Sequence, residues 1–278
     1  MVNRTRYFTQ RIAKILIWMA ALSTITVMIL ILFQILREGL PQLSLGFFLN
    51  SPKDMGREGG ILPTIIGTAA LTGVAILFAT PLGVGTAIYL REYTRESRLS
   101  HIIRFGTDCL AGVPSIIFGL FGFVFFVIYL NMGWSILSGG LTLSAMILPT
   151  IISTTEEAIK ATPPSYREAS FSLGGTKWQT VTHAILPSAL PGIFTGVILS
   201  VGRSIGETAA IILTAGSSLI LPTSLFSPVR TMSVHFYILA REGISMEMAY
   251  ATGAALILLI LAINTAANWL MYRYVHRG

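Results

Sequence analysis

Long apolar runs separated by short polar segments dominate the chain from one end to the other. About 20 apolar residues are enough to cross the hydrocarbon core of a bilayer, so these runs predict membrane-spanning helices. The run from 109 to 155 holds no charged residue and is too long for one span, and its Asn131–Trp134 and Ser138–Gly140 segments mark a turn. The pattern therefore predicts an all-α integral membrane protein, a single transmembrane domain over 1–278, with six spans at 15–36, 61–90, 106–130, 140–160, 187–215 and 247–271.

Composition agrees with a membrane protein. Hydrophobic residues make up 53% of the chain and charged residues 11%, with a mean hydropathy of +0.74, whereas soluble domains carry roughly 25% charged residues. The net charge of +7 could suggest a nucleic-acid partner. Its basic residues flank apolar runs instead, so lipid headgroups and topology explain them better and we expect no nucleic-acid partner.

The positions of the basic residues predict the orientation of the chain. With the N-terminus in the cytoplasm, thirteen Lys or Arg residues fall on the cytoplasmic side and only Arg37, Lys53, Arg57, Arg230 and Arg241 fall outside. Lys and Arg are enriched in cytoplasmic loops. We therefore expect both termini, and the loop at 162–187, to be cytoplasmic.

The loop at 162–187 carries signals for two short helices. Pro163 and Pro164 end the preceding span, and Ser165 with Glu168 has the spacing of a capping box. Gly174 and Gly175 would end the first helix. The spacing recurs at Thr176 and Gln179, and Pro187 would close the second helix. The pattern predicts a rigid helix–glycine–helix unit, which suits a loop that transmits a push.

Arg203 and Glu207 are charged residues inside the fifth apolar run. An Arg at mid-membrane costs roughly 2.5–3.5 kcal/mol on insertion scales and usually lines a cavity or pairs with a partner. Spacing of four places both side chains on one helix face, beside a bare strip at Gly202 and Gly206. One interpretation is that the Arg203 fork meets a tetrahedral oxyanion, with Glu207 holding or moderating it. The other is a buried pair that locks two helices.

Ser115 is a further candidate for the substrate pathway. It follows Pro114, where a kink could expose backbone carbonyls. The chain contains no phosphate-binding loop of the form G-x-x-x-x-G-K-[ST], so it cannot bind ATP in that way, and we expect no cofactor and any ATP to be bound by another subunit. We expect no metal site, because the four histidines lack ligand spacing: His101, His183, His235 and His276. We also expect no enzymatic activity, because no catalytic constellation is evident.

Several segments resemble known transport proteins. Glu168, Ala169, Gly174, Leu186 and Pro187 match the EAA loop of ABC-importer permeases, and the chain departs from that pattern at two positions, Ser170 and Ala184. Four segments narrow the resemblance to PstA-type permeases of phosphate importers: GGILPTIIGT (59–68), PLGVGTAIYLREY (81–93), AGVPSIIFGLFG (111–122) and GRSIGETAA (202–210). Molybdate and tungstate permeases carry similar sequences.

The resemblance implies a type I ABC-importer permease fold in a prokaryotic inner membrane. It implies a PstC-like permease subunit, two copies of a cytoplasmic ATPase subunit and an extracytoplasmic phosphate-binding protein as partners. The residues that would contact the ATPase are Glu168, Ala169, Ser170, Leu173 and Gly174. Two alternatives stay open: a permease for molybdate, tungstate or sulfate, and an ion-coupled carrier or channel that needs no ATPase.

Overall fold

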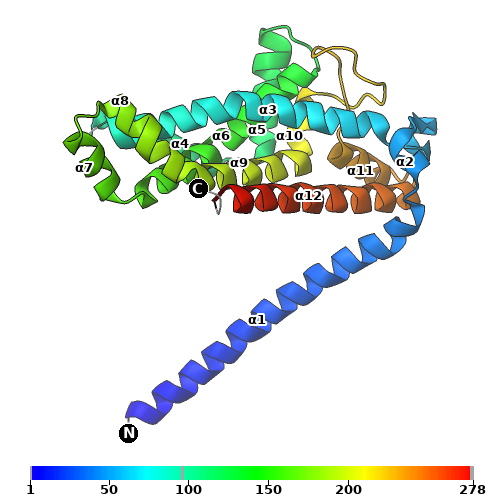
Figure 1. Cartoon of the computed structure of the whole chain (residues 1–278). Helices are drawn as coiled ribbons and strands as arrows, with labels where there is room; N and C mark the ends of the chain where they lie inside the picture. The colour runs from blue at the N-terminus through cyan, green and yellow to red at the C-terminus, as the bar shows by residue number, and fades with distance from the viewer. Residues whose placement is uncertain (1, 95–96, 276–278) are drawn as a thin grey trace.

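The computed structural model describes the backbone of residues 2–94 and 97–275, most of which is helical. Long helices run side by side, and one of them stands away from the rest (Figure 1). The longer elements are α1 (Val2–Gly39), α3 (Leu62–Ile88), α4 (Arg98–Ala111), α5 (Ser115–Gly122), α6 (Ile136–Ala161), α7 (Pro164–Ser172), α9 (Leu186–Gly206), α11 (Met232–Arg241) and α12 (Met246–Val275).

Short elements connect the long helices. Three are π-helical turns: η3 (Tyr89–Tyr93), η4 (Phe123–Tyr129) and η5 (Val181–Ile185). The others are η1 (Leu40–Gln42), α2 (Leu45–Leu49), η2 (Asp54–Gly56), α8 (Lys177–Thr180) and α10 (Ala209–Thr214), with an antiparallel pair of strands, β1 (Pro52–Lys53) and β2 (Glu58–Gly59), that registers Pro52 with Gly59. We call the end with α7 and α8 the loop end, and the opposite end the α11 end (Figure 1).

Among the described residues, five helices are long and apolar enough to cross a membrane, and there are six if a bent pair of helices counts as one span. The expected spans at 15–36, 61–90, 140–160 and 247–271 are confirmed as helices: Thr9–Gln42, Leu62–Tyr93, Ile136–Ala161 and Met246–Arg273. The long apolar run between 109 and 155 divides near the predicted turn, where Ser135 caps the start of α6.

The expected single helix at 106–130 is wrong. Two helices, Arg98–Ala111 and Ser115–Tyr129, meet there at a bend of 105°. Pro114 has no backbone N–H to donate and disfavours helical geometry in the residue before it, which explains why the helix stops at Ala111. Helix α4 starts in the charged segment before this bend, where Ser97 and Ser100 form a capping box.

Two expectations about the fifth span and its preceding loop are also wrong. Pro187 does not close a helix: the chain stays helical from Lys177 to Gly206. The N–H of Leu186 donates to the carbonyl of Val181, five residues back, and this π turn accommodates a residue that cannot donate. The expected span at 187–215 is also not one continuous helix, because helical geometry stops at Gly206 and resumes at Ala209.

The main core lies where α3, α6 and α10 pack together. Leu71, Leu143, Ile147, Ile151 and Ile211 are fully or almost fully buried there. Glycines allow close approach of the helices: a Cβ on Gly83 of α3 would lie 2.7 Å from Ile151 Cγ2 of α6. Helix α3 is thereby fixed along its length against α6.

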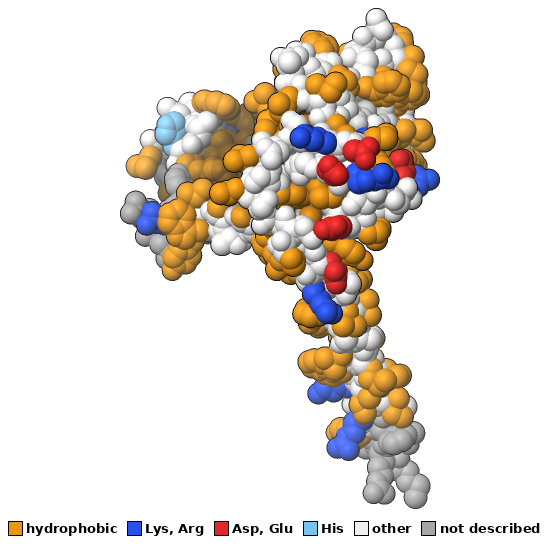
Figure 2. Space-filling model, turned by 90° about the vertical axis from the view of Figure 1, so that its right-hand side faces the viewer, with side chains coloured by type: hydrophobic (Ala, Val, Ile, Leu, Met, Phe, Trp, Pro, Cys, Tyr) orange, Lys and Arg blue, Asp and Glu red, His pale blue; other side chains and the backbone are white. Residues whose placement is uncertain are grey.

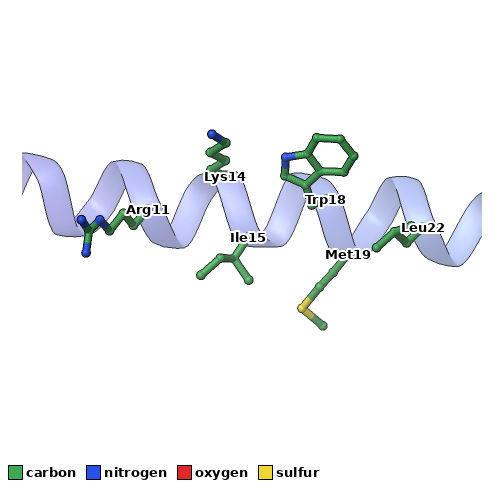
Figure 3. A pocket seen from close by; sticks show the side chains of 6 residues that line it. All are labelled: Arg11, Lys14, Ile15, Trp18, Met19 and Leu22. Carbon is green, nitrogen blue, oxygen red and sulfur yellow. The ribbon is translucent and has the colours of Figure 1, made fainter.

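Helix α1 stands away from this bundle, and none of its apolar window is buried within the chain (Figure 1). Figure 3 shows Lys14 and Trp18 on one side of this helix, with Ile15 and Met19 on the other. Basic and aromatic side chains at the start of a span suit the level of the lipid headgroups. The surface of α1 is thus available to lipid or to another subunit.

Charged side chains of both signs gather at the α11 end (Figure 2). Lys53, Asp54, Arg57 and Glu58 are exposed in the short hairpin that precedes α3. The Arg57 Nε donates to the Ile244 carbonyl at 3.2 Å and so ties this hairpin to the turn between α11 and α12.

Candidate anion pathway and coupling loop

Arg203 lies near the end of α9 and is exposed on the single chain. Within the described residues no carboxylate forms an ion pair with it. A Cβ on Gly202 or Gly206 would meet no described atom within 4 Å, so the strip beside Arg203 is open. An unpaired guanidinium beside an open strip is free to bind an anion.

Glu207 is not on the same helix face as Arg203, and this expectation is wrong. The chain is extended at Glu207 (φ −70°, ψ 136°), one residue after α9 ends. The Glu207 Oε1 instead accepts a hydrogen bond from the Ala210 N–H at 3.2 Å and so caps the first turn of α10. A carboxylate near a helix N-terminus is stabilised there.

The break between α9 and α10 is held from α11. Ser233 Oγ donates to the Glu207 carbonyl at 2.5 Å. The neighbouring Met232 N–H donates to Thr68 Oγ1 of α3 at 3.0 Å. The break therefore has partners from a separate element, which sequence spacing did not reveal.

Arg230 and His235 form a buried polar pair next to this contact. Arg230 Nη1 contacts His235 Nδ1 at 3.4 Å, and Arg230 Nε donates to the Ser217 carbonyl at 2.9 Å. Burial, and then the charge of Arg230, lowers the pKa of His235 to about 4. Burial also lowers the pKa of Arg230, which the charge of Glu242 partly offsets. The sequence indicated only that His235 is not a metal ligand.

Ser115 is the first residue of α5, directly after the bend at Pro114, and it is half-buried. The kink expected at this position is confirmed by the angle between α4 and α5. Metal ligands do not converge here or elsewhere: within the described part of the chain, no three His, Cys, Asp or Glu side chains gather. His276 lies outside the described residues.

The coupling loop (162–187) begins with two short helices that are braced against each other. Ser170 Oγ and Thr180 Oγ1 are 2.7 Å apart, and the Gly175 N–H donates to the Ser170 carbonyl at 2.9 Å. The predicted capping box of Thr176 and Gln179 is confirmed. The one predicted for Ser165 and Glu168 is wrong, because Pro163 is the N-cap and the helix has already begun at Pro164.

The loop presents apolar side chains to its surroundings. Leu173 is 90% exposed and Trp178 is 65% exposed, and Tyr166 and Phe171 are also exposed. Glu168 and Ala169 lie on the same short helix and are exposed. Gly174 has a positive φ of 81°, which glycine adopts without steric cost. The turn at Gly174 borders an open hollow of about 430 Å³, which is lined by Ser170, Leu173, Gly174, Gly175, Gln179 and His183.

Sequence reasoning missed one ionic contact behind this loop. The Arg167 side chain of α7 pairs with Glu92 of η3 at 2.6 Å. Opposite charges at one predicted membrane face were the only available signal, because the two residues are 75 positions apart.

Residues 79–277 match the family described as binding-protein-dependent transport system inner membrane component. The phosphate transport system permease protein PstA of Pasteurella multocida is 35% identical over 242 residues, covering 86% of this chain and 85% of that protein. The probable ABC transporter permease protein YqgI of Bacillus subtilis is 32% identical over 281 residues, covering 95% and 96%.

Solved structures agree on the fold. A chain of a bacterial alginate ABC transporter has a TM-score of 0.68 at 16% identity, covering 96% of this chain and 98% of that one. A chain of the MetNI methionine ABC transporter has a TM-score of 0.67 at 18% identity, covering 77% and 95%. The fold is that of type I ABC-importer permeases.

These similarities and the apolar helices indicate a multi-pass protein of the bacterial inner membrane, the membrane component of a transporter and not its ATPase. It works with other ABC components. The chain belongs to the family of binding-protein-dependent transport system inner membrane components, as a PstA-type permease.

Proposed function

We propose that this chain, as one permease domain over 1–278, forms the pathway for inorganic phosphate together with a second, PstC-like permease subunit. The assignment of phosphate as the substrate rests on the environment of Arg203. This residue is a guanidinium on an apolar helix that has no carboxylate partner among the described residues and borders an open strip. Relatives named as phosphate transport permeases support the same substrate.

Two copies of a cytoplasmic ATPase would drive the complex, and the exposed face of the coupling loop would dock in a groove of one of them. Glu168, Ala169 and Leu173 lie on that face, with Ser170 and Gly174 shaping the turn. An exposed apolar side chain such as Leu173 gains from burial in a partner groove. The orientation with both termini in the cytoplasm puts this face on the side where ATP is.

An extracytoplasmic binding protein would deliver phosphate at the α11 end. The second permease subunit would cover surfaces that this chain leaves open, such as α1 and the strip beside Arg203. In this arrangement Arg203 and Ser115 contact the anion during its passage. Glu207 shapes the pathway by capping α10 and does not bind the anion itself.

The test is reconstitution of the whole complex in proteoliposomes. We expect phosphate, added with its binding protein, to stimulate ATP hydrolysis and to accumulate inside the vesicles. Stimulation by molybdate, tungstate or sulfate in place of phosphate would assign a different oxyanion. Uptake by this chain without the ATPase, under an ion gradient, would contradict the whole assignment in favour of an ion-coupled carrier.

A further inference from the structure

One guanidinium joins three elements at the loop end of the molecule. Arg167 belongs to α7, and its Nη2 and Nε donate to Glu92 Oε1 of η3 at 2.6 and 3.2 Å. The same side chain donates to the carbonyls of Ile159 and Thr162, each at 3.3 Å, at the end of α6. The first helix of the coupling loop is therefore tied to the end of α6 and, through η3, to the end of α3.

The pair is shielded from solvent. The Glu92 side chain is 9% exposed and that of Arg167 is 26% exposed. The nearby Glu157–Lys160 pair is different, because its side chains are 73% and 62% exposed. Exposed ion pairs contribute little to stability, whereas removal of one partner of a shielded pair is destabilising because it leaves an unpaired buried charge. Movement of Arg167 should therefore carry Glu92 with it.

The second helix of the loop contacts the same turn. Lys177 Nζ lies over the Tyr93 ring, 5.1 Å from its centroid. Both loop helices thus contact η3, which directly continues α3. A π turn at the end of a long helix is a known feature of functional sites. A push on the loop would reach α3 through this turn.

The other end of α3 contacts the elements around the helix break. Thr68 Oγ1 accepts the bond from Met232, and a Cβ on Gly67 would lie 2.9 Å from the Arg230 carbonyl. Ser233 follows Met232 and donates to the Glu207 carbonyl. A helix rises 1.5 Å per residue, so Thr68 and Glu92 are separated by about 36 Å along the axis.

From these contacts we infer that the Glu92–Arg167 ion pair is the joint through which the coupling loop moves α3, and through α3 and α11 the break beside Arg203. The inference rests on the proposed function, since it needs an ATPase that pushes the loop. It gives Glu92 and Arg167 a positioning role in coupling. Neither residue contacts the substrate.

The test measures phosphate transported per ATP hydrolysed by the complete complex in proteoliposomes. Glu92→Gln, Arg167→Met and the double variant each remove the charge pair. Glu92→Gln keeps the side-chain length, and Arg167→Met keeps the apolar stem but shortens the side chain. We expect each to lower this ratio at least about fivefold, the low end of coupling effects between sites. The double variant should lose no more than Arg167→Met alone, because Arg167→Met already removes the interaction with Glu92 together with the bonds to the Ile159 and Thr162 carbonyls. Glu157→Gln, on the exposed pair, is the matched control and should leave the ratio unchanged.

Arg167→Lys is a second variant that keeps a charge opposite Glu92, and it should retain part of the ratio and the normal amount of bound ATPase. The inference is overturned by an unchanged ratio, by losses that add in the double variant, or by a fall in bound ATPase that accounts for the loss. The ratio can be measured with molybdate if phosphate does not stimulate the wild-type complex. In that case phosphate is wrong as the substrate, and the experiment still tests the role of the Glu92–Arg167 ion pair.

Discussion

Ser233 Oγ donates a hydrogen bond of 2.5 Å to the backbone carbonyl of Glu207, 26 residues earlier in the chain. This carbonyl lies one residue beyond the end of α9, where it cannot take part in a helical ladder. The bond therefore satisfies a backbone group that the break leaves free. It also fixes α11 to the segment that follows Arg203.

We expect Ser233→Ala to weaken this attachment and lower phosphate uptake. A partly buried carbonyl left without its partner costs about 1–3 kcal/mol, and the break should then sample other positions. Uptake by the reconstituted complex, with thermal unfolding as a second measurement, checks the prediction. Ser218→Ala removes a hydroxyl that bonds only locally to Ile220 and is the control. Equal behaviour of the two variants would show that the Ser233 bond is dispensable.

Arg203 and Glu207 should respond differently to neutral substitutions. Arg203→Gln removes the only charge proposed to meet the anion, and a hydrogen bond to a charged group is worth about 1.5–3 kcal/mol. We therefore expect uptake to fall by at least about tenfold. Arg203→Lys should retain part of the uptake, since it keeps the charge but loses the planar fork. Co-purification of the partner subunits should be normal in both.

Glu207→Gln should change uptake less than about twofold. The carboxylate forms no ion pair with Arg203 and accepts from the Ala210 N–H, a role that an amide oxygen can also fill. The same uptake assay measures it. A loss as large as that of Arg203→Gln would mean that the two side chains act as a pair.

This difference marks what the sequence could and could not predict about the site. The spacing of Arg203 and Glu207 indicated one helix face only on the assumption that the helix continues. Its end at Gly206 depends on the cap of α10 and on the bond from Ser233, which belongs to a distant element. Such tertiary contacts leave no local pattern in the sequence.

The spans and the loop were more predictable, because their signals are local. Apolar length alone located four of the spans, and the Thr176–Gln179 box formed as its spacing indicated. Pro187 was misleading, since a π turn before it lets the helix continue. The Glu92–Arg167 pair was out of reach, because 75 residues separate its members.

Leu173 offers a direct test of ATPase binding. Its side chain is 90% exposed, so Leu173→Asp should leave the fold of this chain unchanged. Burial of a carboxylate in an apolar groove without a partner is strongly unfavourable. We expect the ATPase subunit to be lost on purification of the complex. Leu45→Asp, at a position near the α11 end that is 81% exposed, is the control and should retain the ATPase.

The buried His235 predicts a pH dependence of stability. Its pKa is lowered from 6.5 to about 4 by burial and by the adjacent Arg230, so folding favours the neutral ring. Between about pH 4 and pH 6.5 the imidazole of the unfolded chain therefore binds a proton more readily than that of the folded chain. The stabilisation is therefore complete above about pH 6.5 and is lost as the pH falls toward 4, up to about 3 kcal/mol from this residue.

His235→Gln should flatten this dependence, since its amide oxygen can still accept from Arg230 and does not titrate. The measurement is thermal unfolding of the purified protein at pH 7.5 and pH 5. The wild type should lose more stability than the variant between the two conditions. His183→Gln removes an exposed imidazole of the coupling loop and should behave as the wild type. If His235→Gln loses as much stability on acidification as the wild type, other groups cause the dependence and the buried imidazole does not.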